Sequence, residues 1–350
     1  MISAVQQACK ANYRGSRHHS IDEAMIAFKG RSSMKQYMPK KPTKRGFKVW
    51  VRADSKNGYV FELECYTGRQ GSTTEVGLGG NVVTHLTRDL VGQHYCVYMD
   101  NFFTSIPLFQ RLLDDGIYAT GTMRTNRKKF PGDLLSVAKK GLASRGDMEF
   151  RQDGNMVVTV WQDTKPVTIM STQHDPDVTA TVKRKKGDGS KVDVTCPQAV
   201  IDYNAHMGGV DLGDQYRKYY QGRMKSRKFY KYIFWFLFEI CILYSFVLHH
   251  YSPCIGKNLN YLDYRIELAK QLIGNYCSRK RLGRPPSSSV PPPKRITLSH
   301  FPAKTTKGRC AHCKNGRTVW HCGQCDKRLC HTGIRDTDCY LKYHTDQGLM

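Results

Sequence analysis

The sequence is poor in acidic residues. Its 350 residues hold 29 Asp and Glu against 55 Lys and Arg, a formal net charge of +26 at pH 7. Between residues 268 and 325 there is no Asp or Glu at all, beside 12 Lys and Arg. This balance favours a polyanionic partner, of which nucleic acid is the first candidate. Membrane surfaces and acidic proteins remain the alternatives.

Long apolar segments are also scarce. The first fifteen residues, MISAVQQACKANYRG, lack the apolar region of a signal peptide. One run, residues 232–248, resembles a membrane span, but it is shorter than the ~20 residues that a span requires and holds Glu239 at its middle. We therefore expect a core helix there and no membrane partner.

Cysteine is sparse except at the end of the chain, where six of 13 cysteines fall within the last 41 residues. Two Cys-x2-Cys pairs predict zinc rather than disulfides, and hence a reducing compartment. Eight candidate ligands fit two structural Zn²⁺ ions with interleaved, cross-brace pairs: Cys310, Cys313, Cys322, Cys325, Cys330, His331, Cys339 and His344. His321 competes with His331 for the eighth place, and His312 is a spare.

The first third of the chain has the element order of a ribonuclease-H-like core. Strands are expected at residues 20–28, 47–53, 59–65, 95–99 and 117–123, because apolar residues alternate or form short β-rich runs. Helices are expected at residues 82–90 and about 105–113. The fold class is therefore α/β, a ribonuclease-H-like mixed sheet interrupted by an insertion domain, with a small C-terminal zinc domain.

Four carboxylates fit phosphoryl-transfer chemistry. Asp22 begins the first strand and Asp100 ends the fourth, where open α/β sheets place their chemistry. Asp211 and Asp214 share one helical face after a Gly-Gly pair that permits close backbone approach. Such acids can hold two Mg²⁺ ions. Taken alone, an acid such as Asp100 is more often a cap or turn residue, and the rest of the chain is what favours the catalytic interpretation.

The composition along the chain also divides it into segments. Residues 1–19 form a polar lead-in, 20–123 the first part of the core, and 124–198 an insertion domain. The core closes with helices over 199–255, followed by a basic Pro- and Ser-rich linker, 256–307, and the cysteine-rich domain, 308–350.

Two basic stretches are candidate DNA contacts. Residues 217–231 interleave basic and aromatic side chains that either follow a DNA backbone or pack in a core. Residues 280–285, KRLGRP, resemble an AT-hook, a nuclear localisation signal or a solvated linker. The candidate residues are Arg217, Arg223, Lys225, Arg227, Lys228, Lys280, Arg281 and Arg284.

Five motifs, in order, resemble the piggyBac family of DNA transposases and its host-domesticated relatives: SIDEAMIAFKGR, YMPKKPTKRGFKVW, MDNFFTS, YNAHMGGVDLGDQ and the terminal cysteine module. By motif match, Asp22, Asp100 and Asp211 resemble the catalytic triad and Asp214 an accessory acid. The resemblance implies two-metal cut-and-paste transposition through hairpinned ends at TTAA sites. It also implies double-stranded DNA, a second copy of the chain and chromatin proteins as partners, and a nuclear location.

One departure opens an alternative. The family carries a DNA-binding and dimerisation region ahead of the first catalytic strand, and here only 21 residues precede Asp22. The intact acids favour a Mg²⁺-dependent transposase. The short front favours a truncated or domesticated protein that binds DNA or chromatin without catalysis.

Overall fold

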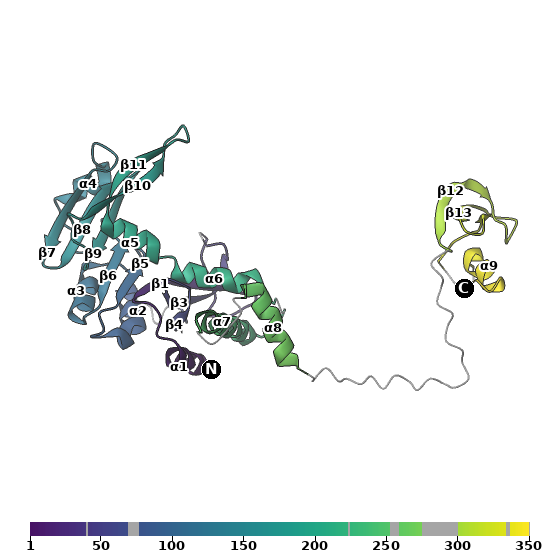
Figure 1. Cartoon of the computed structure of the whole chain (residues 1–350), viewed down its shortest axis with the longest axis horizontal. Helices are drawn as coiled ribbons and strands as arrows, with labels where there is room; N and C mark the ends of the chain where they lie inside the picture. Colours follow the sequence, from purple (N-terminus) through teal and green to yellow (C-terminus); the bar gives the residue numbers. More distant parts are fainter. Residues whose placement is uncertain are drawn as a thin grey trace. The chain divides into compact units, whose positions relative to one another are not determined.

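The computed structural model describes residues 1–39, 41–68, 77–222, 225–252, 259–274, 300–333 and 337–349. The chain divides into two compact units, Met1–Gly274 and Asn275–Met350. The first unit contains the large mixed sheet and most of the helices, and the second contains a small sheet with one helix (Figure 1).

A nine-stranded sheet forms the centre of the first unit. Eight strands follow the order β2-β3-β1-β5-β6-β9-β8-β7, and β4 also pairs with β3. Their bounds are β1 His18–Ala27, β2 Gln36–Tyr37, β3 Arg45–Asp54, β4 Val60–Cys65, β5 Cys96–Met99, β6 Tyr118–Thr122, β7 Met148–Asp153, β8 Met156–Gln162 and β9 Pro166–Ser171.

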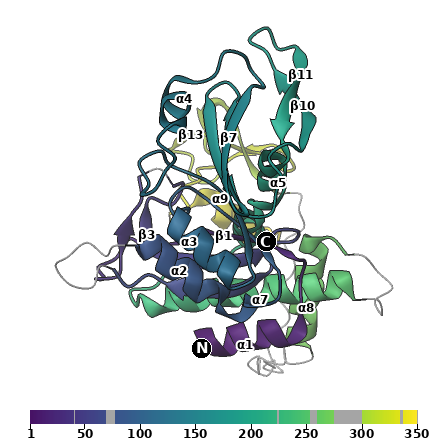
Figure 2. The same cartoon turned by 90° about the vertical axis from the view of Figure 1, so that its left-hand side faces the viewer.

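The predicted ribonuclease-H-like order is present at the centre of this sheet. β1, β3 and β4 are antiparallel neighbours, whereas β5 and β6 run parallel to β1. The parallel crossovers contain α2 (Leu78–Thr87), continued by the 3-10 turn Arg88–Leu90, and α3 (Ile106–Asp114). The two helices lie side by side on one face of the sheet (Figure 2). The mixed α/β fold is therefore confirmed.

The segment expected as an insertion domain, 124–198, is partly continuous with this sheet. β9 pairs antiparallel with β6, so β7, β8 and β9 extend the sheet rather than form one of their own. Only β10 (Thr179–Lys185) and β11 (Lys191–Pro197) form a separate two-stranded hairpin. The short helix α4 (Leu134–Lys140) precedes β7.

Successive side chains of β1 and β3 point to opposite faces of the sheet, and a buried core lies on each face. Ile21 and Trp50 pack with buried residues of α2 and α3. Ala24 and Val49 pack on the other side with buried residues of α6 (Gly209–Tyr219) and α7 (Tyr230–Tyr251). Because the strands at the centre of the sheet are covered on both faces, they show short runs of apolar residues rather than strict alternation.

Helix α7 is the segment that resembled a membrane span. Within the described residues it is long and apolar enough to cross a membrane by length and composition, with 44% of its apolar window buried. Glu239 is 4% exposed and accepts a 2.6 Å hydrogen bond from Arg265 of α8 (Tyr261–Ile273). Buried residues of the same helix pack on the β1–β3 core. This is the packing of a core helix with a neutralised internal charge.

Two parts of the predicted organisation differ from the structure. The lead-in 1–19 contains α1 (Ile2–Asn12), whose Cys9 is 2% exposed and packs beside β4 and α7. The predicted linker 256–307 contains all of α8 and most of β12 (Pro302–Arg309). Both helices hold apolar residues, but α1 buries only Cys9 and α8 only Tyr261 and Tyr264, so the packing partner rather than the local pattern decides where they lie.

The second unit is a three-stranded sheet with a short helix. β12 pairs with β13 (Arg317–Cys322), which pairs with β14 (Lys327–Arg328), and α9 (Cys339–Asp346) follows. Its buried apolar cluster consists of Leu329, Tyr340 and three cysteines, Cys310, Cys322 and Cys339. Because so small a core supplies little folding free energy, other stabilising interactions are required.

Candidate catalytic and metal sites

Asp22 and Asp100 lie at the same edge of the central sheet. β1 and β5 are parallel, and their pairing ends with Ile21 opposite Met99. The next residue along each strand direction is Asp22 in the one case and Asp100 in the other. The parallel register thus brings together two carboxylates that lie 78 positions apart in the chain (100 − 22).

The Asp22 carboxylate is nearly enclosed, with its side chain 14% exposed. The Glu23 backbone N–H donates a 2.8 Å hydrogen bond to Asp22 Oδ1. The Lys41 ammonium stands 3.8 Å from Asp22 Oδ2. Burial raises the pKa of Asp22 to about 7, and the negative charge of Glu23 adds to the rise while Lys41 opposes it. Ionisation of Asp22 is therefore costly, because the effect of burial outweighs that of the one cation beside it.

Asp100 also stabilises the turn that follows β5, which was the alternative interpretation of its sequence position. Its Oδ1 accepts a 2.8 Å hydrogen bond from the Phe102 N–H, and its carbonyl accepts one from the Thr104 N–H. Burial raises the pKa of Asp100, which the Phe102 hydrogen bond opposes and the charge of Glu23 reinforces. One oxygen of this carboxylate thus positions the strand end, and burial makes ionisation of the carboxyl costly.

Helix α6 supplies the other two acids and lies very close to the sheet. A Cβ added at Gly209 would lie 2.6 Å from the carbonyl oxygen of Asp54, and Gly213 similarly faces Gly58. The Val210 N–H donates a 3.0 Å hydrogen bond to Ser20 Oγ. Glycine is therefore required where this helix crosses the sheet. Gly208, by contrast, has nothing within 4 Å of an added Cβ.

Asp211 and Asp214 have different surroundings. Asp211 is exposed in the first turn of α6, and its charge interacts with that of Lys41. Asp214 accepts a short hydrogen bond from the buried Arg217 and lies 3.3 Å from Lys218 Nζ. The carboxylate of Asp214 is thus already paired with two cations, which suits a residue that positions the helix.

Among the described residues, the only groups of three or more potential ligands with atoms within 4.8 Å of one another lie in the second unit. The four predicted acids are not gathered so tightly. Asp22 and Asp100 share one edge, and the charge of Asp211 on α6 interacts with that of Lys41, which lies beside Asp22. Like-charged carboxylates repel, so close approach requires a cation among them.

The cysteine-rich unit contains two tetrads of metal-ligating side chains. One is formed by Cys310, Cys313, Cys330 and Cys339, and the other by His300, Cys322, Cys325 and His344. In sequence order the two sets interleave, which is the predicted cross-brace arrangement. All positions are occupied by protein atoms, and such closed sets are structural rather than catalytic.

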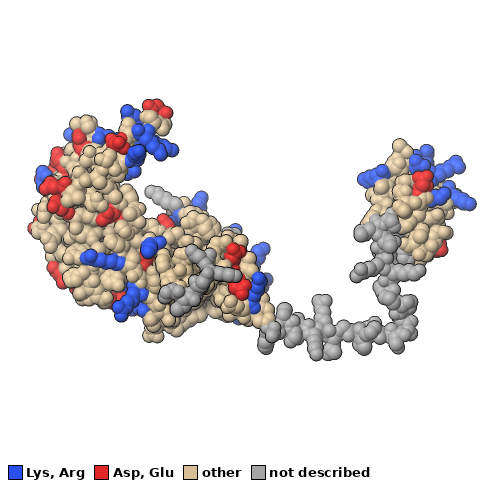
Figure 3. Space-filling model, viewed as in Figure 1, with Lys and Arg blue, Asp and Glu red and all other residues tan. Residues whose placement is uncertain are grey.

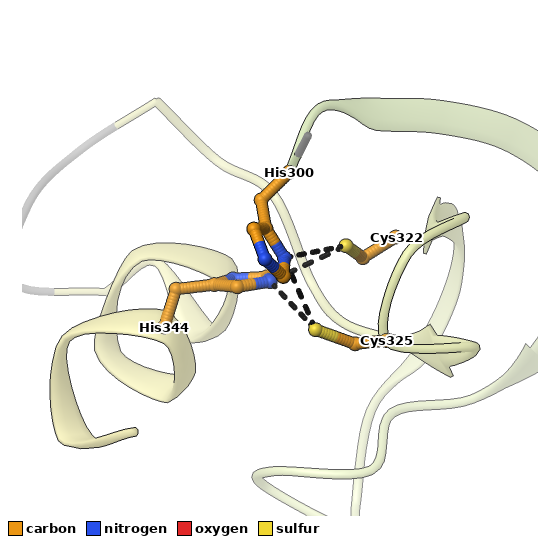
Figure 4. Close-up of side chains that lie close together, drawn as sticks. All are labelled: His300, Cys322, Cys325 and His344. Carbon is orange, nitrogen blue, oxygen red and sulfur yellow. Dashed lines mark hydrogen bonds between the residues drawn. The ribbon is translucent and has the colours of Figure 1, made fainter. Parts of the chain in front are cut away.

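The second tetrad already has ligand spacing suitable for zinc (Figure 4). His300 Nδ1 lies 3.2 Å from Cys325 Sγ, and His344 Nε2 lies 3.3 Å from Cys322 Sγ. Ligand atoms around a tetrahedral zinc ion stand about 3.5 Å apart. His344 Nδ1 lies 2.7 Å from the Tyr340 carbonyl, which leaves Nε2 free to ligate. Burial opposes ionisation of Cys322, but hydrogen bonds lower its pKa to about 6.

The prediction of His331 as the eighth ligand is wrong, because His300 takes that place. His331 Nδ1 lies 2.8 Å from Asp338 Oδ2, and Asp338 caps the start of α9. His321, the competing candidate, pairs with Asp326 at 2.9 Å. His300 was missed because it lies ten residues before Cys310, outside the cysteine run, at the end of a Pro-rich stretch.

The candidate DNA contacts differ in how exposed they are. Arg217 is 6% exposed and stacks 4.2 Å from the Phe236 ring centroid, so its prediction as a DNA contact is wrong: it pairs with Asp214 inside the fold. Lys225, Arg227 and Lys228 are exposed. Arg223, Lys280, Arg281 and Arg284 lie outside the described residues. Lys and Arg also gather on the β10–β11 hairpin and on the second unit (Figure 3).

Comparison with known proteins agrees with this arrangement. The family described as Transposase IS4 matches residues 1–246. PiggyBac transposable element-derived protein 3 of Homo sapiens is 29% identical over 362 aligned positions, covering 99% of this chain and 58% of that protein. PiggyBac transposable element-derived protein 5 of Homo sapiens is 24% identical, over 78% of this chain and 54% of its own length. The chain thus spans a little over half of these relatives.

A solved structure extends the comparison to the fold. A piggyBac transposase in a synaptic complex with hairpin DNA superposes with a TM-score of 0.67 at 26% identity, covering 88% of this chain and 68% of that one. The sheet-edge acids, the strand order and these matches together lead to one assignment. The chain belongs to the Transposase IS4 family and is one of its piggyBac members.

Proposed function

We propose that this chain is a metal-dependent DNA transposase that cleaves transposon ends in double-stranded DNA and transfers them to TTAA sites. The observation that carries the proposal is the placement of Asp22 and Asp100 on adjacent parallel strands at one sheet edge. Both residues are half-buried, and desolvation raises the pKa of each carboxyl. Paired acids of this kind are typical of sites that perform phosphoryl transfer.

The donor set at this edge suits Mg²⁺. Carboxylate oxygens are the hard ligands that Mg²⁺ prefers, and the charges of Asp22, Glu23 and Asp100 are only partly neutralised by Lys41. Asp22, Asp100 and Asp211 would hold two Mg²⁺ ions, with Asp214 in support. When bound, the pair of ions supplies activation of the attacking oxygen and stabilisation of the leaving oxygen.

The protein's own residues prepare this edge. The Phe102 and Thr104 N–H groups fix the end of β5, so Asp100 projects at a defined point. Gly209 and Gly213 allow α6 to lie against the sheet, which keeps Asp211 on the same side as Asp22. The Arg217–Asp214 pair anchors that helix through the buried Arg217.

The basic surface and the second unit would engage DNA. With a net charge of +26, the chain is suited to a polyanion. We propose that two Zn²⁺ ions hold the second unit and that this unit contributes to recognition of the ends. A homodimer, a nuclear location and contacts with chromatin proteins complete the proposal, since paired transposon ends require two active sites and genomic DNA as target.

The test is cleavage of a duplex that carries a transposon end flanked by TTAA, by the full chain with Mg²⁺ or Mn²⁺. Strand nicks at the end are expected, and Asp22→Asn or Asp100→Asn should reduce their rate by orders of magnitude while DNA binding persists. Asp114→Asn, at the exposed end of α3, is the matched control and should cleave normally. Equal cleavage by Asp22→Asn and the unmodified chain would contradict the site.

A second function is favoured by one observation. The human relatives are described as PiggyBac transposable element-derived proteins. If the chain binds duplex DNA in a salt-dependent way but yields no nicks with either metal, it is a DNA- or chromatin-binding protein derived from a transposase.

A further inference from the structure

We propose that Lys41 is a built-in counterion of the acid site, occupying the position of a metal ion until a divalent cation displaces it. The inference rests on the proposed function, because it assumes that Asp22 belongs to a divalent-metal site. In this arrangement, Glu23 and Asp22 together hold the Lys41 ammonium. A metal ion must then compete with that ammonium for the carboxylate oxygens.

The Lys41 ammonium is surrounded by oxygen atoms from the strand that carries Asp22. Its Nζ lies 3.3 Å from Glu23 Oε1, 3.8 Å from Asp22 Oδ2 and 3.5 Å from the carbonyl oxygen of Glu23. The two carboxylates are well buried, with side chains 11% and 14% exposed. One monovalent cation therefore stands where several oxygens converge.

The attraction extends across the site. The carboxylates of Asp22 and Glu23 attract the ammonium directly, and the charge of Asp211 acts on it at longer range. Lys41 thus interacts with an acid on β1 and with another on α6. A cation that interacts with carboxylates of two different elements has the position expected for a bridging metal ion.

This contact differs from the structural ion pairs of the same fold. Arg52 is 1% exposed and donates to both oxygens of Asp89 at 2.7 and 2.8 Å. Such bidentate pairs fix geometry. Lys41 instead makes longer contacts from the segment between β2 and β3, and its side chain is 29% exposed. A flexible point charge of this kind can leave the site without disturbing the sheet.

A second lysine, whose charge interacts with those of Asp22 and Glu23, is held differently. Lys48 lies in β3 and is 8% exposed, with its ammonium 3.6 Å from the Trp50 ring centroid. Its place is fixed by the strand and by the aromatic ring. Lys41 is therefore the residue whose charge can be exchanged for that of an ion.

Competition makes a directional prediction. In the unmodified chain, a divalent ion must displace the Lys41 ammonium before it can bind the carboxylate oxygens that now contact Lys41. Lys41→Met removes the competitor and a repulsive charge, so affinity for the ion should rise about three- to tenfold, the effect of one partly screened charge pair. Lys41→Arg keeps the charge and should bind no more tightly than the unmodified chain.

The experiment is a titration of the full, zinc-loaded chain with Mn²⁺, followed by electron paramagnetic resonance of the free ion. Mn²⁺ substitutes for Mg²⁺ because both prefer oxygen ligands. Lys44→Met is the matched control, because Lys44 is exposed in the same segment and its loss changes the net charge equally. Asp22→Asn identifies which binding belongs to the acid site. Lys41→Gln, a polar neutral replacement, provides a second variant if the methionine variant does not fold.

Tighter Mn²⁺ binding by Lys41→Met or Lys41→Gln, with Lys44→Met and Lys41→Arg unchanged, supports the proposal. Unchanged or weaker binding by the neutral Lys41 variants, while Asp22→Asn abolishes binding, overturns the counterion role and leaves the metal site intact. If the unmodified chain has no Mn²⁺ binding that Asp22→Asn removes, the proposed function fails together with this inference.

Discussion

The unfavourable charge at Asp22 predicts that removing it stabilises the fold while removing the proposed activity. Burial holds the pKa of Asp22 at about 7, against an ordinary value of 3.8. Three pKa units correspond to about 4 kcal/mol of cost for keeping this carboxylate ionised in the folded chain. Neighbouring charges contribute to this value, and removing the charge of Asp22 also leaves Lys41 with one partner fewer, so Asp22→Asn should gain about half of the cost, about 2 kcal/mol, at pH 8.

The sign follows from proton binding in the two states. Below pH 4, Asp22 is protonated whether the chain is folded or unfolded, and it costs nothing. Between pH 4 and 7 the unfolded chain has released the proton while the folded chain retains it, so the free energy of unfolding falls as the pH rises. Above pH 7 the cost is complete. The neutral asparagine of Asp22→Asn avoids this free-energy cost at every pH.

The measurement is urea or thermal unfolding of the full chain at pH 5 and pH 8, followed by tryptophan fluorescence. A gain of about 2 kcal/mol raises the melting temperature of a unit of this size by about 4–8 °C at pH 8, and about a third of that gain should remain at pH 5. Asp114→Asn, on the exposed surface, should change neither value. A destabilised Asp22→Asn variant at pH 8, or an equal gain at both pH values, would refute the reasoning.

Three other outcomes are expected. The full chain should contain about two zinc ions, and His300→Ala should reduce this to about one, whereas His331→Ala should retain both by metal analysis. Equal loss in the two variants would contradict the assignment of His300. Gly209→Ala should destabilise the first unit by about 2–3 kcal/mol because its Cβ would meet backbone at 2.6 Å, while Gly208→Ala, with open space around it, should be nearly neutral in urea unfolding. Duplex DNA affinity should fall with added salt, with a slope of about −0.9 in log K against log salt for each phosphate contacted; a flat response would contradict electrostatic binding.

The sequence by itself determined the central fold and the identity of the main acids. Strands and helices in the first third follow from the alternation and short apolar runs that any two-sided sheet requires. Asp22 and Asp100 could be selected because a strand order predicts which strand ends meet at one edge. The cysteine spacing likewise predicted two interleaved sets of potential metal ligands, since Cys-x2-Cys pairs have few other uses.

Only the tertiary structure decided which of several equivalent side chains occupy the remaining positions. His300 and His331 are chemically alike, and the choice depends on the fold that turns one towards Cys322 and the other towards Asp338. Arg217 looks like any exposed basic residue until α7 covers it and Phe236 stacks against it. Lys41 joins the acid site through a segment whose path no local pattern encodes. Local periodicity specifies helices and strands. Contacts between distant residues depend on how those helices and strands pack, and they can be identified only once the chain is folded.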